Sequence, residues 1–462
     1  MKKAFQMPNT LALIFYTVML MAVCTWIIPG GEYDRIESHG KQVPVAGSFR
    51  FIEHVPQSIQ IFTAPVKGFA DAVSIIAFLL IIGGAFGVIQ ETGAVAAFIK
   101  QTALHLGRNS TLRVLFIPVI MMLFSLGGAI FGMCEETMPF ILIIVPLALS
   151  LGYDSLVGTA IPFLGAAAGF GGAFFNPFTV GIAQGFAGLP LYSGLPYRII
   201  VWSVTTAVTI AFVMWYAARV HRDPSISPVY DLDQEKREKL HVQQDEGGEV
   251  TARHTAILLI FLAGIVLLVV GILKFKWFIE EIAALFFALG IICGYAGGLS
   301  SDSIAKSYMA GAKDMINPVL IIACARGILI IALDGKILDT ILYYLASFIS
   351  HFPPLVTAWS MFFVQSIINF FVHSGTGQAA LTIPIMAPLS DLVGVTRQTA
   401  VLAFQLCELV NPVLPTSAVT MGILGLAGIP WNRWIKWFLP LLALYVLLAM
   451  ALLVWPVLAQ WN

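Results

Sequence analysis

Long apolar segments with few charges recur along the whole chain, and they constrain its fold more than any other feature. Segments such as 71–90, 197–218 and 434–455 can cross a bilayer as helices, which takes about 20 residues. Of the 462 residues, 59% are hydrophobic and only 11% are charged, whereas soluble domains have about 25% charged residues. Because such a chain cannot cover its surface with polar groups, the sequence predicts an all-α polytopic membrane protein.

Composition and patterning exclude several other classes. Basic and acidic residues number 25 each, and the resulting net charge of +0 does not suggest the basic face of a nucleic-acid binder. Long apolar runs differ from the short alternating segments of an outer-membrane barrel. The sequence contains no nucleotide-binding loop and no common hydrolase motif, so neither an ATP-driven pump nor an intramembrane enzyme is favoured. No cofactor or resident metal is expected, because the five cysteines lie in apolar runs without paired spacing.

The apolar segments predict how the chain is divided and oriented. The start, Met1-Lys2-Lys3 before an apolar run, is expected to form an uncleaved first helix with its N-terminus in the cytoplasm of a bacterium with an inner membrane. Lys and Arg are more numerous on the segments predicted to lie inside, and about nine full crossings are expected. The predicted parts are an N-terminal helix with an extracytoplasmic segment (1–70), a first repeat (71–218), a hydrophilic cytoplasmic linker (219–254), two connecting helices (255–300) and a second repeat (301–462).

Each repeat contains a pair of apolar arms joined by a polar tip. In the first, the tip is Gly132-Met133-Cys134-Glu135-Glu136-Thr137, and in the second it is His373-Ser374-Gly375-Thr376-Gly377-Gln378. Both returning arms, 138–151 and 381–393, are short for a full crossing. A short arm after a polar tip at membrane depth predicts a re-entrant hairpin. The first hairpin would enter from the cytoplasm and the second from outside, which makes the repeat inverted.

An overlong helix interrupted by an Asn-Pro dipeptide follows each hairpin. Segment 156–189 contains Asn176-Pro177-Phe178-Thr179, and segment 396–428 contains Asn411-Pro412 followed by Pro415-Thr416. Proline breaks the helical ladder and leaves unpaired carbonyls and amides at membrane depth. One such motif alone would be explained by helix capping. Its repetition after an overlong helix favours a transporter binding site, where half-helix N-termini suit an anionic group and freed carbonyls suit Na⁺.

Four ionisable residues are predicted to lie deep in the membrane, where each needs a cavity or a partner: Glu135, Glu136, Arg326 and Glu408. The glutamates could bind a cation or carry a proton, although a tip that reaches water would leave the Glu135–Glu136 pair merely solvated. Arg326 either pairs with Glu408 or binds a substrate carboxylate. The predominance of acids favours a coupling cation, a cationic substrate or both. Four tryptophans are instead expected to anchor helices at the membrane interface: Trp431, Trp434, Trp437 and Trp455.

The two tips resemble those of a known family. The tip Glu135-Glu136-Thr137-Met138-Pro139 and the second tip with its returning arm, residues 373–389, are similar to the YfcC-like branch of the anaerobic C4-dicarboxylate carrier family, which is placed in the ion transporter superfamily. The resemblance implies a homodimer of elevator-type carriers, in which a scaffold holds a mobile transport domain with both hairpins and both broken helices. It also implies a secondary transporter that uses ion coupling, by Na⁺ or H⁺, or exchange.

The predicted substrate and ion site combines the resemblance with the residues at the tips and breaks. It comprises Glu135, Glu136, Thr137, Asn176, Pro177, Thr179, Ser374, Gly375, Thr376, Gln378, Glu408, Asn411, Pro412 and Thr416, with Arg326 as a substrate clamp or ion-pair partner. Better-known dicarboxylate carriers of the superfamily have Ser-Asn-Thr at both tips, whereas this chain has Glu-Glu-Thr and Ser-Gly-Thr. A doubly negative tip suits a dianion poorly unless cations or protons intervene. A basic amino acid such as arginine or ornithine is therefore the alternative to a small organic acid.

Overall fold

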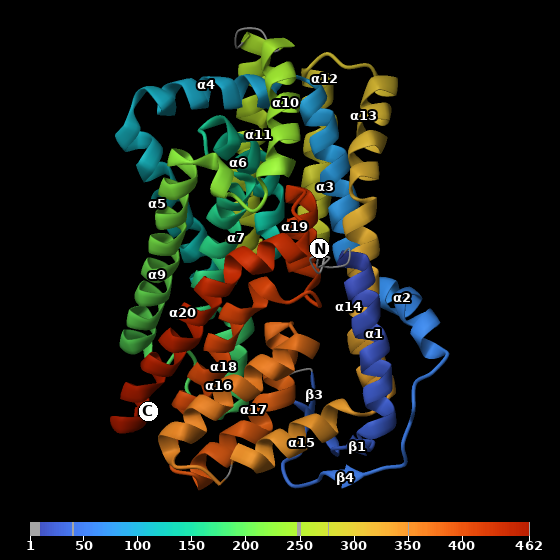
Figure 1. Ribbon diagram of the computed structural model, residues 1–462, viewed down its shortest axis with the longest axis vertical. Coiled ribbons are helices and arrows are strands. Elements are labelled where there is room, and N and C mark those ends of the chain that lie inside the picture. The colour runs from blue at the N-terminus through green and yellow to red at the C-terminus, as the bar shows by residue number, and fades with distance from the viewer. Residues whose placement is uncertain (1–9, 39–40, 247–250, 276, 350, 462) are drawn as a thin grey trace, which may run out of the picture.

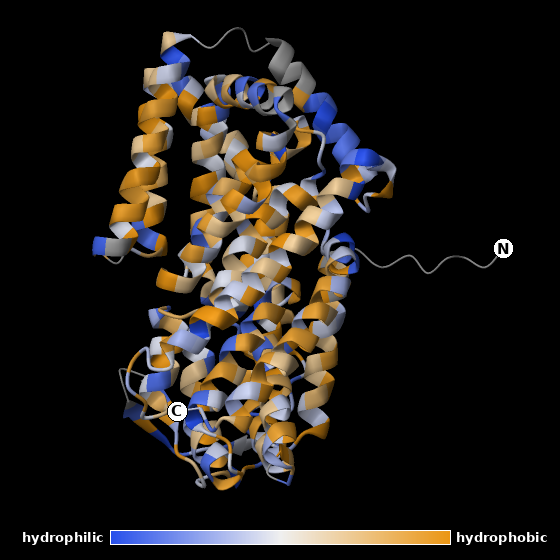
Figure 2. Ribbon diagram, turned by 90° about the vertical axis from the view of Figure 1, so that its left-hand side faces the viewer, coloured by the Kyte–Doolittle hydropathy of each residue, from blue (hydrophilic) through white to orange (hydrophobic). Residues whose placement is uncertain are grey.

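The computed structural model describes residues 10–38, 41–246, 251–275, 277–349 and 351–461. Met1-Lys2-Lys3 therefore lies outside the described residues. The chain is almost entirely helical (Figure 1), which confirms the predicted fold class. Hydrophobic residues cover most of the helices (Figure 2), as expected for a protein that crosses a bilayer.

Helix α1 (Thr10–Ile27) is followed by a small region of strands that the all-helical prediction did not anticipate. It holds two antiparallel ribbons, β1 (Gly31–Glu32) with β4 (Arg50–Phe51) and β2 (Arg35–Ser38) with β3 (Lys41–Pro44). An exposed hydrogen bond and ion pair from Arg50 to Glu32, at 2.6 Å, fastens the first ribbon and lowers the pKa of the Glu32 carboxyl. Strands this short provide too little alternation to be recognised in a sequence.

The two halves repeat the same order of elements. The first half contains α2 (Gln60–Asp71), α3 (Val73–Glu91), α4 (Ala94–Arg108), α5 (Ser110–Phe131), η1 (Glu135–Thr137), α6 (Met138–Ser150), α7 (Ser155–Gly171), η2 (Pro177–Gly181), α8 (Ile182–Phe186) and α9 (Leu195–Arg222). After η3 (Pro224–Ile226), α10 (Tyr230–Glu246), α11 (Ala252–Phe275) and α12 (Ile279–Ala296), the second half contains α13 (Ser301–Asp314), α14 (Ile316–Asp334), α15 (Leu338–Ile349), α16 (Pro354–Phe371), α17 (Gly375–Leu392), α18 (Arg397–Cys407), η4 (Glu408–Val413), α19 (Ala418–Ala427) and α20 (Trp431–Leu458).

The arrangement in space has the inversion that the sequence predicts. Helix α4 runs across the upper end of the molecule and its counterpart α15 across the lower end (Figure 1). The hairpin of α5 and α6 lies in the upper half, and the hairpin of α16 and α17 lies in the lower half (Figure 1). Equivalent elements therefore approach the middle of the molecule from opposite ends.

A kinked pair of helices stands at the start of each half. Helices α2 and α3 form a bent pair, as do α13 and α14, and the two pairs lie antiparallel so that α3 packs on α13 and α2 on α14. A Cβ at Gly311 would lie 2.2 Å from the Gly83 carbonyl oxygen, and one at Gly68 would lie 2.2 Å from that of Ala323. Only glycine permits this approach. Helix α2, placed with the N-terminal segment in the sequence interpretation, occupies the position equivalent to α13.

Nine helices among the described residues are long and apolar enough to cross a membrane. The sequence also predicts nine crossings, but the two sets differ. The hairpin arms α5 and α16 meet the length criterion, whereas α7, with 17 residues, does not. Length alone cannot separate a crossing from a hairpin arm, because an arm of 18 residues that turns at a polar tip has the same composition as a span.

The segment predicted as a hydrophilic linker, 219–254, contains the helix α10, which packs on the upper end of the hairpin and broken helices. Asp233 is buried and accepts hydrogen bonds from the Ser155 amide (2.7 Å) and hydroxyl (2.6 Å) at the start of α7. Lys236 donates to the carbonyl of Ala427 at the end of α19, at 2.9 Å. Arg237 donates to the carbonyl of Leu149, in the last turn of α6, and to that of Tyr153, which follows this helix. These bonds satisfy backbone groups that helix ends leave unpaired.

Candidate functional site

Both hairpins turn at positions that the local sequence explains. Helix α5 ends at Gly132, whose φ of +75° is the left-handed conformation that glycine adopts at a helix C-terminus. In the second hairpin, Ser374 caps α17 by accepting a hydrogen bond from the Gly377 amide. The second tip is therefore shorter than predicted, because residues from Gly375 onward already belong to the returning helix.

The broken helices are interrupted where the Asn-Pro dipeptides predict. The first half-helix, α7, ends at Gly171, and the Asn176 side chain accepts a hydrogen bond from the Phe178 amide at 2.9 Å as the next turn begins. The second changes from α18 to the tighter turn η4 at Glu408, and α19 begins only at Ala418. The two breaks lie against each other, since a Cβ at Gly171 would lie 3.1 Å from the Leu409 amide nitrogen.

Each asparagine holds the tip of its own hairpin. Asn176 is fully buried against Gly132, where an added Cβ would lie 2.8 Å from its Oδ1, and its Nδ2 lies 3.5 Å from the Gly128 carbonyl oxygen. Asn411 Nδ2 lies 3.4 Å from the His373 carbonyl oxygen and 3.1 Å from Glu408 Oε2. The inverted repeat thus places one amide side chain behind each tip.

A cavity of about 310 Å³ opens where the tips, the second break and the junction of α2 with α3 meet. Its size is at the small end of the range of ligand pockets, roughly 300–1,000 Å³. Eight of the predicted site residues line it: Glu135, Arg326, Ser374, Gly375, Thr376, Glu408, Asn411 and Pro412. Other polar side chains on its wall belong to Asp71, Ser74, Cys134, His373, Ser417 and Thr420.

The remaining predicted residues lie behind this wall. Glu136 and Thr137 are buried and bond to the backbone of Cys134, which fixes the first tip. Gln378 is bonded to Gln365 and Asn369 of the opposite arm, at 2.8 Å and 2.9 Å, and so ties the two arms of the second hairpin together. The others are Asn176, described above, Pro177, which is exposed, Thr179, which is buried, and Thr416, which donates to the Phe370 carbonyl.

Thr179 nevertheless connects the first break to the cavity. A Cβ added to Gly375 would lie 2.5 Å from Thr179 Cγ2 and 3.3 Å from Glu408 Oε1. The next residue of the tip, Thr376, donates to the carbonyl of Phe178 at 2.9 Å. The second tip therefore lies between the two breaks, and a side chain larger than hydrogen at position 375 would separate them.

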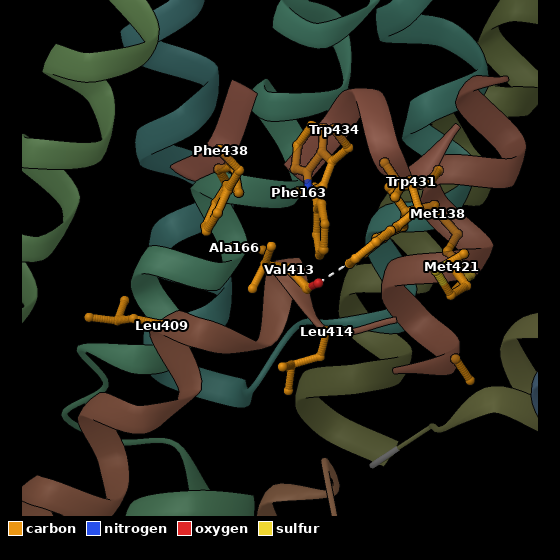
Figure 3. Close-up of a cluster of buried hydrophobic side chains, with 14 of the residues drawn as sticks. Met138, Phe163, Ala166, Leu409, Val413, Leu414, Met421, Trp431, Trp434 and Phe438 are labelled. Carbon is orange, nitrogen blue, oxygen red and sulfur yellow. Dashed lines mark hydrogen bonds between the residues drawn. The ribbon is translucent and has the colours of Figure 1, made fainter. Parts of the chain in front are cut away.

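Two backbone carbonyls of the second break, those of Pro412 and Val413, accept hydrogen bonds from tryptophans, contrary to the expectation that they would be open to a cation. Trp434 Nε1 donates to the Pro412 carbonyl at 2.8 Å. Trp431 Nε1 donates to the Val413 carbonyl at 2.9 Å (Figure 3). Trp431, Trp434 and Trp437 are buried within the chain, so the prediction that they are interface anchors is wrong. Trp455 is 49% exposed.

Arg326 contacts Asp71 and His373, whereas the sequence analysis gave Glu408 as one possible partner. Its Nε lies 2.8 Å from Asp71 Oδ2, and its Nη1 lies 2.7 Å from His373 Nε2. Sequence reasoning missed Asp71 and His373 as site residues. Asp71 resembles an ordinary polar residue at the edge of an apolar segment, and only the kink between α2 and α3 brings it to the cavity. His373 was visible as the first residue of the polar tip.

Comparison with known proteins agrees with this architecture. The model of the C4-dicarboxylate anaerobic carrier family, DcuC, matches residues 7–458. The chain belongs to this family. Within the DcuC family it is similar to the Escherichia coli K12 protein named "Putative basic amino acid antiporter YfcC", with 38% identity over 461 residues, 91% of this chain and 90% of that protein. An uncharacterized Haemophilus influenzae Rd protein is 30% identical over 448 residues, 87% of each chain.

Two solved transporters align with nearly the whole DcuC-family chain at low identity. The Alcanivorax borkumensis YdaH transporter aligns with a TM-score of 0.43 and 14% identity, covering 98% of this chain and 99% of that one. Neisseria gonorrhoeae MtrF, whose description refers to antimetabolite efflux pumps, aligns with a TM-score of 0.40 and 16% identity, covering 97% and 95%. Family membership, shown by the sequence, makes this DcuC-family protein a membrane transporter of the YfcC-like branch and not an enzyme.

Proposed function

We propose that this protein is a secondary active transporter that carries a basic amino acid across the bacterial inner membrane by ion coupling or exchange. In this proposal its N-terminus is cytoplasmic, it forms a homodimer, and the hairpins and broken helices move as a unit past α2 and α14 in an elevator-type cycle. The cavity shared by both tips and by the α2–α3 junction supports alternating access, because it lies between those two groups of elements.

The charge of the cavity wall carries the choice of substrate. Three carboxyl side chains line the cavity: Asp71, Glu135 and Glu408. Among the described residues, Arg326 is the only lysine or arginine on its wall. Arg326 is already paired with Asp71 at 2.8 Å. Two carboxyl groups are left for a substrate or a coupling cation, and carboxyl groups at membrane depth need such a partner. A basic amino acid supplies the cationic group, as the name of the E. coli relative suggests for that protein.

A C4-dicarboxylate, the substrate in the family's description, is the second candidate and requires cations to accompany it. Glu408 Oε1, Asn411 Oδ1 and Thr179 Oγ1 are buried without hydrogen-bond partners among the described residues. Oxygen atoms are the ligands that hard cations prefer, and an unpartnered buried oxygen is costly unless something binds it. These three side chains are therefore the candidates for a transported Na⁺, with the glutamates as candidates for a proton.

A thermal-shift screen of the purified protein tests the substrate. Arginine and ornithine should raise the unfolding temperature, since a ligand at one hundred times its Kd stabilises by roughly 2.7 kcal/mol. Succinate and fumarate should have no effect without Na⁺. Counterflow of radiolabelled arginine in proteoliposomes should then distinguish a carrier from a channel, because only a carrier exchanges substrate across the bilayer against its gradient.

The alternative outcomes are distinct. Stabilisation by dicarboxylates that depends on Na⁺, with no response to arginine, would replace the basic amino acid by the family's described substrate. Uptake without saturation or counterflow would contradict a carrier mechanism. Glu408→Gln should raise at least tenfold the arginine concentration needed to increase the unfolding temperature. The matched control Glu238→Gln, at an exposed position on α10, should leave this concentration unchanged.

A further inference from the structure

The guanidinium of Arg326 connects two parts of the molecule that are distant in sequence. Arg326 lies on α14, Asp71 ends α2, and His373 begins the second tip. The Arg326 side chain contacts Asp71 Oδ2 at 2.8 Å and His373 Nε2 at 2.7 Å, and all three residues line the cavity. We call this set the Asp71–Arg326–His373 bridge.

The bridge fixes the protonation state of the imidazole. A guanidinium has donors and no acceptor, so His373 Nε2 must accept the hydrogen bond and cannot carry a proton. A neutral ring then carries its proton on Nδ1, which is buried without a partner among the described residues. Adding a second proton would place two N–H donors against each other and remove the bond to Arg326.

Other charged groups face His373 from the elements around it. The cavity places Arg326 of α14, Asp71 of α2, Glu408 of η4 and Glu135 of the first tip around the second tip. The side chain of Asn411 contacts the His373 carbonyl and is uncharged. A protonated imidazole would therefore be repelled by Arg326, whereas Glu135 and Glu408 would favour its charge.

The bridge is also the link between the second tip and the α2–α14 pair. Among the described residues, the tip 373–378 forms its other hydrogen bonds within its own hairpin, to Asn411 of the second break and to Phe178 of the first. Only the bond from Arg326 reaches α14. A movement of the hairpins and broken helices past α14 would have to break it.

We propose that His373 is a positioning residue that fastens the second hairpin tip to α2 and α14 while its imidazole is unprotonated, and that protonation releases the tip. This inference rests on the alternating-access function proposed above. Acid should therefore accelerate the release of the tip. Arg326 is the residue of α14 that holds the tip in place through the Asp71–Arg326–His373 bridge.

Hydrogen exchange of the reconstituted protein without substrate tests this role directly. In the wild type, the amides of residues 375–392 should exchange about tenfold faster at pH 5.5 than at pH 8, after correction for intrinsic exchange, because protons bind to the released imidazole and not to the one that accepts the bond from Arg326. His373→Gln keeps an acceptor that cannot be protonated, so exchange should remain slow at both pH values. His373→Ala has no acceptor, so exchange should be fast at both.

Transport gives the second readout. The counterflow rate should rise with acidity in the wild type. This acid-dependent rise should be lost in His373→Gln, where the rate stays low, and in His373→Ala, where the rate is already high at pH 8. His105→Gln, an exposed histidine on α4, should retain the pH response of the wild type. If His373→Ala does not fold, His373→Phe replaces it, because phenylalanine also lacks an acceptor.

The two readouts separate the role of His373 from the proposed function. If hydrogen exchange follows the expected pattern but none of the test substrates is transported, the role of His373 is supported and the proposed substrates are contradicted. Active transport with exchange independent of pH in the wild type, or with the same pH response in all three forms, would overturn the role of His373.

Discussion

At the scale of single residues, the site depends on side chains that satisfy interrupted backbone. Asn176 and Asn411 lie behind the two tips, and two tryptophans bond to the carbonyls of the second break. Consequently, the carbonyls of Pro412 and Val413 are already paired, whereas the side-chain oxygens of Glu408 and Asn411 beside them include atoms without a partner among the described residues. Ligand selectivity should therefore respond to side-chain substitutions at the second break.

The asparagines provide a direct test at this scale. Asn176→Ala and Asn411→Ala should each reduce initial uptake by more than tenfold in proteoliposomes while the purified protein stays folded, because each loses an amide behind its tip. The chain contains a matched control in Asn317-Pro318, where the asparagine is exposed in the first turn of α14. Asn317→Ala should transport normally. Unchanged uptake kinetics in Asn411→Ala would remove that residue from the site.

At the scale of elements, the sequence predicted the apolar helices, both hairpins and both breaks within a few residues. Gly, Pro and Asn mark these features locally, and local signals survive in a sequence. It placed α2 outside the first repeat, and it did not predict α13 as a helix within the second repeat or α10 as a packed helix. Those depend on contacts with distant segments, such as Asp233 with Ser155, which no local pattern encodes. The same reason explains why Asp71 was not recognised beside Arg326.

Helix α10 gives a prediction about stability. Asp233→Ala removes the acceptor of two Ser155 bonds and the partner of Lys236, which lies 3.2 Å away, all in a buried position. Breaking a buried, hydrogen-bonded pair costs about 3 kcal/mol, so the unfolding temperature in detergent should fall clearly. Glu238→Ala, exposed on the same helix, serves as the control. Equal unfolding temperatures for the two variants would show that α10 does not stabilise the hairpin and broken helices.

At the scale of the whole molecule, the inverted repeat gives the two ends different surroundings. The linker helix α10 and helix α4 lie at one end, and the strands and α15 lie at the other (Figure 1). The kinked pairs α2–α3 and α13–α14 pack against each other, and glycines allow their backbones to approach closely. A hairpin tip from each half of the chain therefore lines the same cavity.

Labelling with a membrane-impermeant maleimide tests the predicted orientation. Glu37→Cys on β2 and Glu238→Cys on α10 are exposed positions at opposite ends of the molecule. Position 37 should react in intact cells, and position 238 only in inverted membrane vesicles. The unsubstituted protein is the control, since its five cysteines are buried or half-buried. Reaction of both positions from one side would contradict the topology.

The tryptophans at the second break give this protein an optical reporter of its own. Trp434 is fully buried and its indole N–H is hydrogen-bonded to the Pro412 carbonyl. Its ring stacks on that of Phe163, with the two ring centroids 5.9 Å apart. Indole emission depends on such surroundings, so a spectral change on adding a solute would reveal a rearrangement beside the cavity without any attached dye. Replacing Trp434 by phenylalanine would identify the part of the signal that originates there, and stopped-flow recording could then time that rearrangement.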